Sequence, residues 1–161
     1  MTRSRLMLLQ NEKKIPATAL KRESGLWKTM KTALGKSKRK IEHTRLETWA
    51  MPGVPDVVLC DESGNFHFVE LKASTTNAVD LRPHQVSWLS RHKHASTWVL
   101  VLRIADRGTR TKATTPESIS LYHGSDAMDL KFDGLKLDPV YRSDGVVDWD
   151  RILDLIVSRE T

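Results

Sequence analysis

The sequence lacks the features that define several classes of protein. Its 161 residues contain a single cysteine, Cys60, which excludes an internal disulfide framework and is typical of a reducing cytoplasm. No run of 18 or more apolar residues occurs, which predicts that no segment spans a membrane. The apolar run near the N-terminus, Leu-Met-Leu-Leu, is too short for the core of a signal peptide. We therefore expect a cytoplasmic protein.

Motifs of several common enzyme classes are also missing. No Gly-x-x-x-x-Gly-Lys-Ser/Thr loop occurs, which argues against nucleotide hydrolysis. No Gly-x-Ser-x-Gly occurs, as an acyl hydrolase would need. Cys60, His92 and His94 are residue types that bind zinc, but their scatter is not that of a zinc site, and we assign them no metal role.

Acidic residues are scarce in the first part of the chain. The first 40 residues contain 12 Lys and Arg against two Asp and Glu, within a total net charge of +6. Residues 116–161 reverse this balance, with five basic against ten acidic residues. The asymmetry indicates a polyanionic partner, most simply nucleic acid. A solvated basic arm without a partner remains an open alternative.

Hydrophobic periodicity predicts one α/β domain, in which helices flank a small mixed β-sheet. The predicted helices are residues 19–34, 81–93 and a last helix that Asp148 caps. The predicted strands are residues 41–49, 57–60, 66–72, 98–104 and, as the last strand, 119–124. We divide the chain into a basic arm (1–18), a core (19–104) and an acidic extension packed on the core (105–161).

Charged residues interrupt two of the predicted strands where core residues are expected. Glu70 and Lys72 are two residues apart, so they share one face of their strand. Residues 61–65, Asp-Glu-Ser-Gly-Asn, have the composition of a turn and predict a hairpin. That hairpin places Asp56 roughly opposite Glu70 and Lys72, so two carboxylates and an ammonium meet at one edge of the sheet.

Such a cluster has two interpretations. Buried charges are costly unless they are paired or bind a metal, and oxygen ligands favour Mg²⁺ or Mn²⁺ over zinc. A metal held in this way can activate water and stabilise charge on a phosphate, while Lys72 positions the water or binds the phosphate. From Glu-x-Lys alone, a structural ion pair on an exposed strand face is the simpler interpretation.

The wider pattern resembles the PD-(D/E)XK nuclease superfamily. The matching residues are Pro55-Asp56, a strand, a turn, and then Glu70-Leu71-Lys72 in the next strand, with 13 residues between Asp56 and Glu70. The resemblance covers residues 22–104. It implies a restriction-endonuclease-like core, a bound Mg²⁺ or Mn²⁺, and metal ligation by Asp56, Glu70 and the main-chain carbonyl of Leu71.

Two further residues are assigned to this site. Glu23 lies on the apolar stripe of the first helix with Trp27 and Met30, so it is either a helix-start acid or a site residue. The resemblance implies a metal-site acid there. Gln85 is either a polar residue of the first helical turn or, as in the similar phage and VRR-NUC-type nucleases, a partner of the catalytic lysine. We predict catalytic roles for Glu23, Asp56, Glu70, Lys72 and Gln85.

Basic and aromatic residues near this pattern are predicted to contact DNA, chiefly through its phosphates. They are Lys36, Lys38, Arg39, Lys40, Arg45, Trp49 and Arg82. The small, basic chain resembles the archaeal Holliday-junction resolvases and the phage nucleases with resolvase activity, which implies a homodimer acting on branched DNA in a bacterial or phage-infected cytoplasm. Two alternatives remain: cleavage of linear, nicked or flap DNA, and a non-catalytic DNA-binding protein on the same scaffold.

Overall fold

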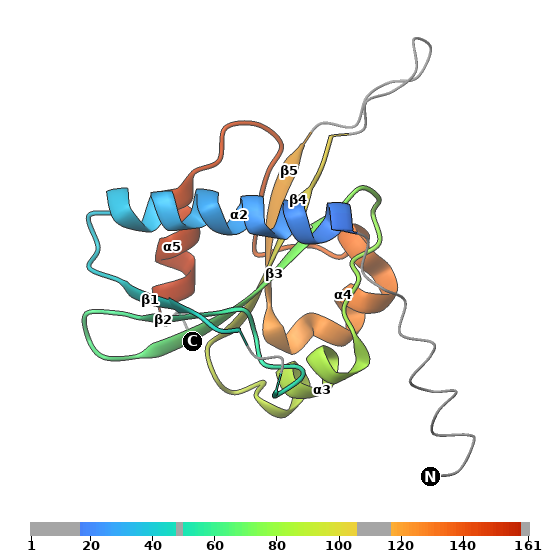
Figure 1. Ribbon diagram of the computed structural model, residues 1–161, viewed down its shortest axis with the longest axis horizontal. Helices are drawn as coiled ribbons and strands as arrows, with labels where there is room; N and C mark the ends of the chain where they lie inside the picture. The colour runs from blue at the N-terminus through green and yellow to red at the C-terminus, as the bar shows by residue number, and fades with distance from the viewer. Residues whose placement is uncertain (1–16, 48–49, 106–116, 159–161) are drawn as a thin grey trace.

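The computed structural model describes residues 17–47, 50–105 and 117–158. In this part of the chain, one mixed sheet of six strands lies between helices, so the predicted α/β class is confirmed (Figure 1). The strands are β1 (Glu42–Arg45), β2 (Val57–Cys60), β3 (Phe66–Ser74), β4 (Thr97–Arg103), β5 (Ser118–His123) and β6 (Tyr141–Ser143). The α-helices are α2 (Ala17–Lys36), α3 (Pro83–Arg91), α4 (Ala127–Asp133) and α5 (Trp149–Val157). Short 3₁₀ turns at Gly124–Asp126 and Gly134–Lys136 flank α4.

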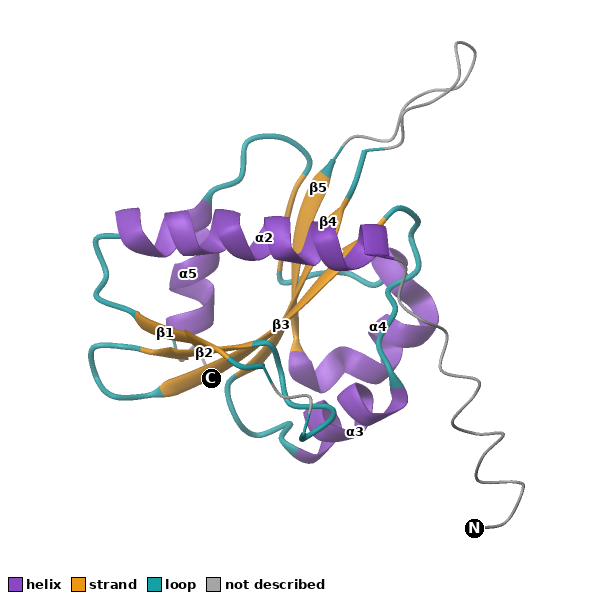
Figure 2. Cartoon of the chain, in the orientation of Figure 1, coloured by secondary structure: helices purple, strands orange, loops and turns teal. Residues whose placement is uncertain are grey.

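The strands follow one another across the sheet in chain order, β1 to β6. Only β3 and β4 are parallel, because α3 crosses between them, and the other neighbours are antiparallel (Figure 2). Two strands of this sheet, β5 and β6, come from the chain beyond residue 104. The sheet is therefore continuous across the boundary that we drew between the core and the extension.

Helices cover both faces of the sheet and bury two apolar cores. On one face, α2 and α5 pack over β3 and β4, with Leu26, Met30 and Leu71 nearly inaccessible to solvent. On the other face, α3 and α4 pack over β4 and β5, around Leu89 and Val101. The continuous apolar run of β4 follows from this double cover, since both faces of the strand lie inside the protein.

The hairpin between β2 and β3 is held by its predicted turn. Asp61 accepts hydrogen bonds at Oδ1 from the backbone N–H groups of Ser63 and Asn65, at 2.9 and 3.0 Å. Gly64 has φ of +79°, a conformation that residues with a Cβ rarely adopt. The local sequence thereby sets the register in which Val57 pairs with Val69.

Most of the predicted elements are confirmed, two expectations are wrong, and one helix was missed. Strand β1 is shorter than the predicted 41–49, since its pairing with β2 ends at Arg45; residues 48–49 lie outside the described residues. The strand at 118–123 is not the last one, because β6 pairs with it through Tyr141. Helix α4 was not predicted. Asp148 does cap α5, accepting from the Arg151 N–H at 3.0 Å. No helix in the described ranges is long and apolar enough to cross a membrane.

Candidate active site

The predicted cluster forms where β2 separates from β3. The last pair in the ladder between these strands is Val57 with Val69. In this ladder, the backbone N–H and C=O groups of the odd-numbered residues of β2 and β3 face the opposite strand. The hydrogen bond from the Asp61 N–H to the Asn65 carbonyl, in the turn between them, follows the same pattern. The next such position on β2 is Pro55, which has no N–H to donate. The ladder stops there, and β3 continues with an open edge.

Asp56 occupies this open edge. Its Oδ2 accepts a hydrogen bond from the Leu71 N–H at 2.8 Å, in the place that a strand partner would take. Within a strand, the N–H and C=O of one residue point to the same side, so the Leu71 carbonyl also faces the open edge. The structure therefore brings together Asp56 and the carbonyl predicted as a main-chain ligand.

Glu70 and Lys72 lie next to this edge, on the face of β3 that α3 covers. Lys72 Nζ lies 3.1 Å from Glu70 Oε1, so the two side chains form an ion pair when Glu70 is ionised. Glu70 is 1% exposed and Lys72 is 6% exposed, so the interpretation as an exposed strand pair is wrong. Buried ion pairs are costly unless further polar groups complete them, and here the next partner is Gln85.

Gln85 connects α3 to the carboxylate. Its Oε1 accepts from the Arg82 N–H at 3.0 Å, which satisfies a free donor at the start of α3. Its Nε2 donates to Glu70 Oε1. Gln85 therefore closes the first helical turn and contacts Glu70, whereas its predicted partnership with the catalytic lysine stays a prediction.

Glu23 reaches the same edge from the opposite face, on α2. The Ala73 N–H and the charges of Lys72 and Arg45 lower the pKa of its carboxyl group, and the charge of Asp56 raises it. Ala73 is the next odd-numbered residue after Leu71, so its N–H also faces the open edge. Glu23 thus lies beside the cluster, and the inward position predicted from the apolar stripe of the first helix is correct.

All three carboxyl groups of the cluster have raised pKa values, and burial is the largest cause for each. For Glu23, Lys72 opposes the rise and Asp56 adds to it. For Asp56, the hydrogen bond from Leu71 opposes the rise. For Glu70, burial raises the pKa to about 8, against the opposing charge of Lys72. Grouped, buried carboxyl groups of this kind are typical of functional sites.

Arg45, predicted to contact DNA, lies close to the carboxyl groups of Glu23 and Asp56. Its guanidinium lies 5.9 Å from the centre of the Trp27 ring, and that ring meets His43 edge-on at 5.6 Å. Its charge lowers the pKa values of Glu23 and Asp56. The sequence analysis did not predict that Trp27 packs against Arg45. Helical spacing was the available signal, because Trp27 follows Glu23 by one turn of α2 and therefore lies near the same site.

The donor set suits a hard divalent cation in part. Asp56, Glu70 and the Leu71 carbonyl offer only oxygen atoms, the ligands that Mg²⁺ prefers, and burial raises the pKa values of both carboxyl groups despite the nearby charge of Lys72. Across the described ranges, no three Asp, Glu, His or Cys side chains converge closely enough to share an ion. Two carboxylates and one carbonyl are therefore the set that fits, and ligation by Glu23 remains a prediction.

The other predicted DNA-contacting residues lie in different places. Lys36, Lys38 and Lys40 are exposed at or beyond the end of α2. About 13 residues separate Glu23 from Lys36, a distance of roughly 20 Å along the helix. Arg82 precedes α3 beside Gln85, and Trp49 lies outside the described residues.

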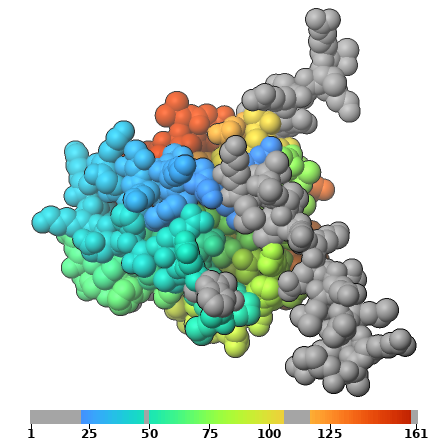
Figure 3. Space-filling model, in the orientation of Figure 1, coloured from blue at the N-terminus to red at the C-terminus, as the bar shows by residue number. Residues whose placement is uncertain are grey.

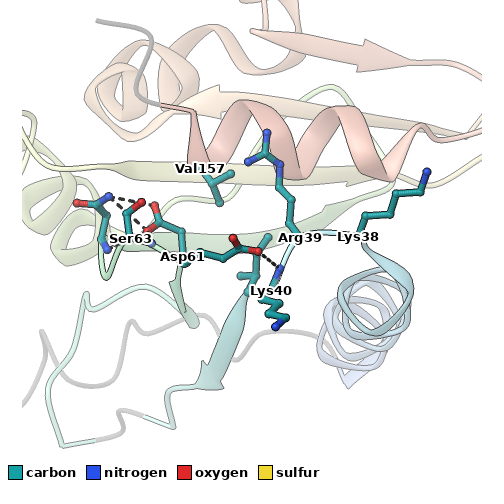
Figure 4. A pocket seen from close by; sticks show the side chains of 9 residues that line it. Lys38, Arg39, Lys40, Asp61, Ser63 and Val157 are labelled. Carbon is teal, nitrogen blue, oxygen red and sulfur yellow. Dashed lines mark hydrogen bonds between the residues drawn. The ribbon is translucent and has the colours of Figure 1, made fainter.

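A separate cleft of about 370 Å³ lies beside the basic loop after α2 (Figure 4). Arg39 is directed to Asp154 of α5, with which it forms an ion pair. The Lys40 N–H donates to Glu62, and Asp61 also lines the cleft. Acidic residues thus offset the basic loop here, which weakens the case that this cleft binds phosphate.

Searches for similar proteins give no family assignment. No protein-family model, curated protein or solved structure matches the chain.

Proposed function

We propose that this protein is a divalent-metal-dependent DNA endonuclease that hydrolyses phosphodiester bonds. The observation that carries the proposal is the meeting of Asp56, Glu70 and Lys72 at the open edge of β3. One buried and two partly buried carboxyl groups lie close together at this edge, and grouped acids repel one another unless a cation offsets their charge. The basic excess in the first 40 residues supports a polyanionic substrate.

Each residue of the cluster has a defined part in this proposal. Asp56, Glu70 and the Leu71 carbonyl would hold Mg²⁺ or Mn²⁺, and Glu23 would complete the acidic site. When bound, the ion supplies Lewis-acid stabilisation of the charge on the phosphate and lowers the pKa of bound water.

The lysine and the glutamine act through their positions. Lys72 is held by Glu70 at 3.1 Å, where its ammonium can orient the attacking water or bind a non-bridging phosphate oxygen. Gln85 keeps Glu70 fixed against rotation through its contact with Oε1. Arg45, held over Trp27, supplies a second positive charge for the phosphate group.

We propose branched DNA, in particular a four-way junction, as the substrate. The sequence contains no recognisable base-reading module, and its basic residues suit contacts to the sugar–phosphate backbone. Symmetric cleavage of a junction needs two active sites, which a two-fold homodimer supplies. The lone Cys60 is consistent with a location in the cytoplasm of a bacterium or a phage-infected host.

The direct test is incubation with a labelled four-way junction and Mg²⁺ or Mn²⁺. We expect a symmetric pair of nicks from the wild type and a loss of cleavage of at least about 100-fold in Lys72→Ala, the usual scale for a group that assists proton transfer. Lys93→Ala, an exposed lysine remote from the cluster, is the matched control. The proposal fails if the wild type cleaves no DNA, or if a folded Lys72→Ala variant cleaves as the wild type does.

Cleavage of linear, nicked or flap DNA is the second candidate. The observation in its favour is that a single chain brings Asp56, Glu70 and Lys72 together, and one centre is sufficient to cut a single strand. Plain duplex, flap and junction substrates of equal length separate the two candidates. Binding of the junction without cleavage in any metal would instead indicate a non-catalytic DNA-binding protein.

A further inference from the structure

The outer face of α2 carries lysines that the proposed active site does not use. Lys28 and Lys36 are exposed and lie eight residues apart, on the side of the helix opposite the buried stripe of Leu26 and Met30. Neither lysine forms an ion pair with a carboxylate in the described part of the chain. Two ammonium groups on the surface therefore have no ion-pair partner among residues 17–47, 50–105 and 117–158.

A hollow of about 460 Å³ lies between these lysines. Thr29, Thr32 and Ala33 of α2 form one side, and Trp149, the first residue of α5, forms the other. In Figure 3, α2 forms a ridge across the front of the molecule, and the red C-terminal part of the chain borders its upper edge. The two threonine hydroxyl groups donate to carbonyls of their own helix.

We propose that this hollow binds the DNA backbone at a distance from the cleavage site. The proposal rests on the nuclease function above and extends it to the substrate beyond the scissile bond. Lys28 and Lys36 would each contact a phosphate, and the Trp149 indole would pack against the sugars between them. An indole flanked by ammonium groups is the usual composition of a sequence-neutral nucleic-acid surface.

The spacing agrees with this assignment. Eight residues of helix place the two lysines roughly 12 Å apart along α2. That span corresponds to about three or four phosphates, since one strand of a duplex carries a charge for roughly every 3.4 Å of axis. Along the helix axis alone, Lys28 is about 8 Å and Lys36 about 20 Å from Glu23, and the larger distance corresponds to about six base pairs.

The hollow is a stronger candidate than the cleft beside residues 38–40. In that cleft, Asp61 and Glu62 add negative charge, and Arg39 is occupied by Asp154. Among the described residues, no acidic side chain lines the hollow on α2, although the exposed Asp148 and Asp150 flank Trp149 in the chain. Net attraction for a phosphate is therefore expected at the hollow, whereas the charges of the cleft largely offset one another.

The test is the salt dependence of DNA binding by the full chain without divalent metal, so that no cleavage occurs. Each phosphate contact contributes about 0.9 to the slope of log K against log salt, so Lys28→Gln combined with Lys36→Gln should lower the slope by about 1.8. Affinity at 0.1 M salt should fall by up to about 60-fold. Thr32→Glu, which places a carboxylate in the hollow, should weaken binding in the same direction.

The matched control is Lys93→Gln combined with Lys136→Gln, which removes the same charge from exposed positions elsewhere. The proposal is overturned if the α2 pair leaves the slope unchanged, or if the control pair lowers it equally. In either case, cleavage by the wild type would leave the nuclease function intact. A wild type that neither binds nor cleaves DNA would overturn both.

Discussion

Replacing Glu70 by glutamine should remove much of the pH dependence of stability in the metal-free protein. Burial raises the pKa of Glu70 from 4.5 to about 8, so the folded state holds the proton more tightly than the unfolded chain does. The sign follows directly. The stability that this group contributes is fully present below pH 4.5 and is lost as the pH rises through 8.

The size of the effect follows from the same values. Between pH 5 and pH 8 the unfolded chain releases the proton while the folded protein largely keeps it, at about 1.4 kcal/mol for each pH unit. The expected loss of unfolding free energy over this range is on the order of 3 kcal/mol. Glutamine keeps the shape and the oxygen acceptor for the Gln85 amide, but it does not titrate.

Urea unfolding in a metal chelator, at pH 5 and at pH 8, measures this directly. The wild type should lose more stability over that range than Glu70→Gln does, by the amount given above. Adding Mg²⁺ at pH 8 should stabilise the wild type more than the variant, because the ion favours the ionised carboxylate. Equal losses in the two proteins would show that folding does not raise the pKa of Glu70. Equal responses to Mg²⁺ would remove this residue from the metal set.

Three other substitutions test separate parts of the structure. Gly53→Ala should destabilise the protein by about 2 kcal/mol or more in thermal unfolding, because a Cβ would lie 2.4 Å from a carbonyl oxygen of α3; Gly64→Ala, also at positive φ but in open space, should cost only about 1 kcal/mol. Asp61→Asn should reduce the loss of stability as the pH falls below 4, because the hydrogen bond from the buried His67 holds the pKa of Asp61 well below its usual range. An unchanged acid-unfolding profile would contradict this prediction. Pro55→Ala restores a backbone donor opposite β3 and should weaken the stabilisation by Mg²⁺, whereas Pro52→Ala in the same loop should not; equal responses to Mg²⁺ would show that the missing donor is unimportant.

Local patterns were sufficient to predict the elements whose residues repeat on one face. The buried stripe of α2 and the apolar run of β4 are each visible in the sequence, and the turn at 61–65 sets the hairpin register. By contrast, α4 has only seven residues and leaves Phe132 76% exposed, so it has no clean apolar face. Strand β6 has three residues and forms through pairing with β5, which no local pattern encodes.

The site was predictable where it depends on strand alternation and hairpin register. Those two rules place Glu70 and Lys72 on one face and bring Asp56 beside them, as the structure shows. They do not reveal that Asp56 binds a backbone N–H of β3 or that Glu70 is almost fully buried. Both facts depend on tertiary packing: α3 covers the face that carries Glu70, and β2 stops before it would pair with Leu71.

The end of β2 is the feature that converts a hairpin into a candidate metal site. If the ladder continued, the backbone groups of Leu71 would be used by a strand partner, and Asp56 would have no donor to bind. Pro55 cannot supply the next N–H, so the ladder ends and the edge of β3 opens toward the carboxylates. Glu70 and Lys72 approach this edge from one face and Glu23 from the other, so the opening is the one place where all four charges can meet. Pro55 would end the strand whether or not acidic residues lay nearby. Because Asp56, Glu70 and Glu23 surround the open edge that it creates, we regard this edge as a site.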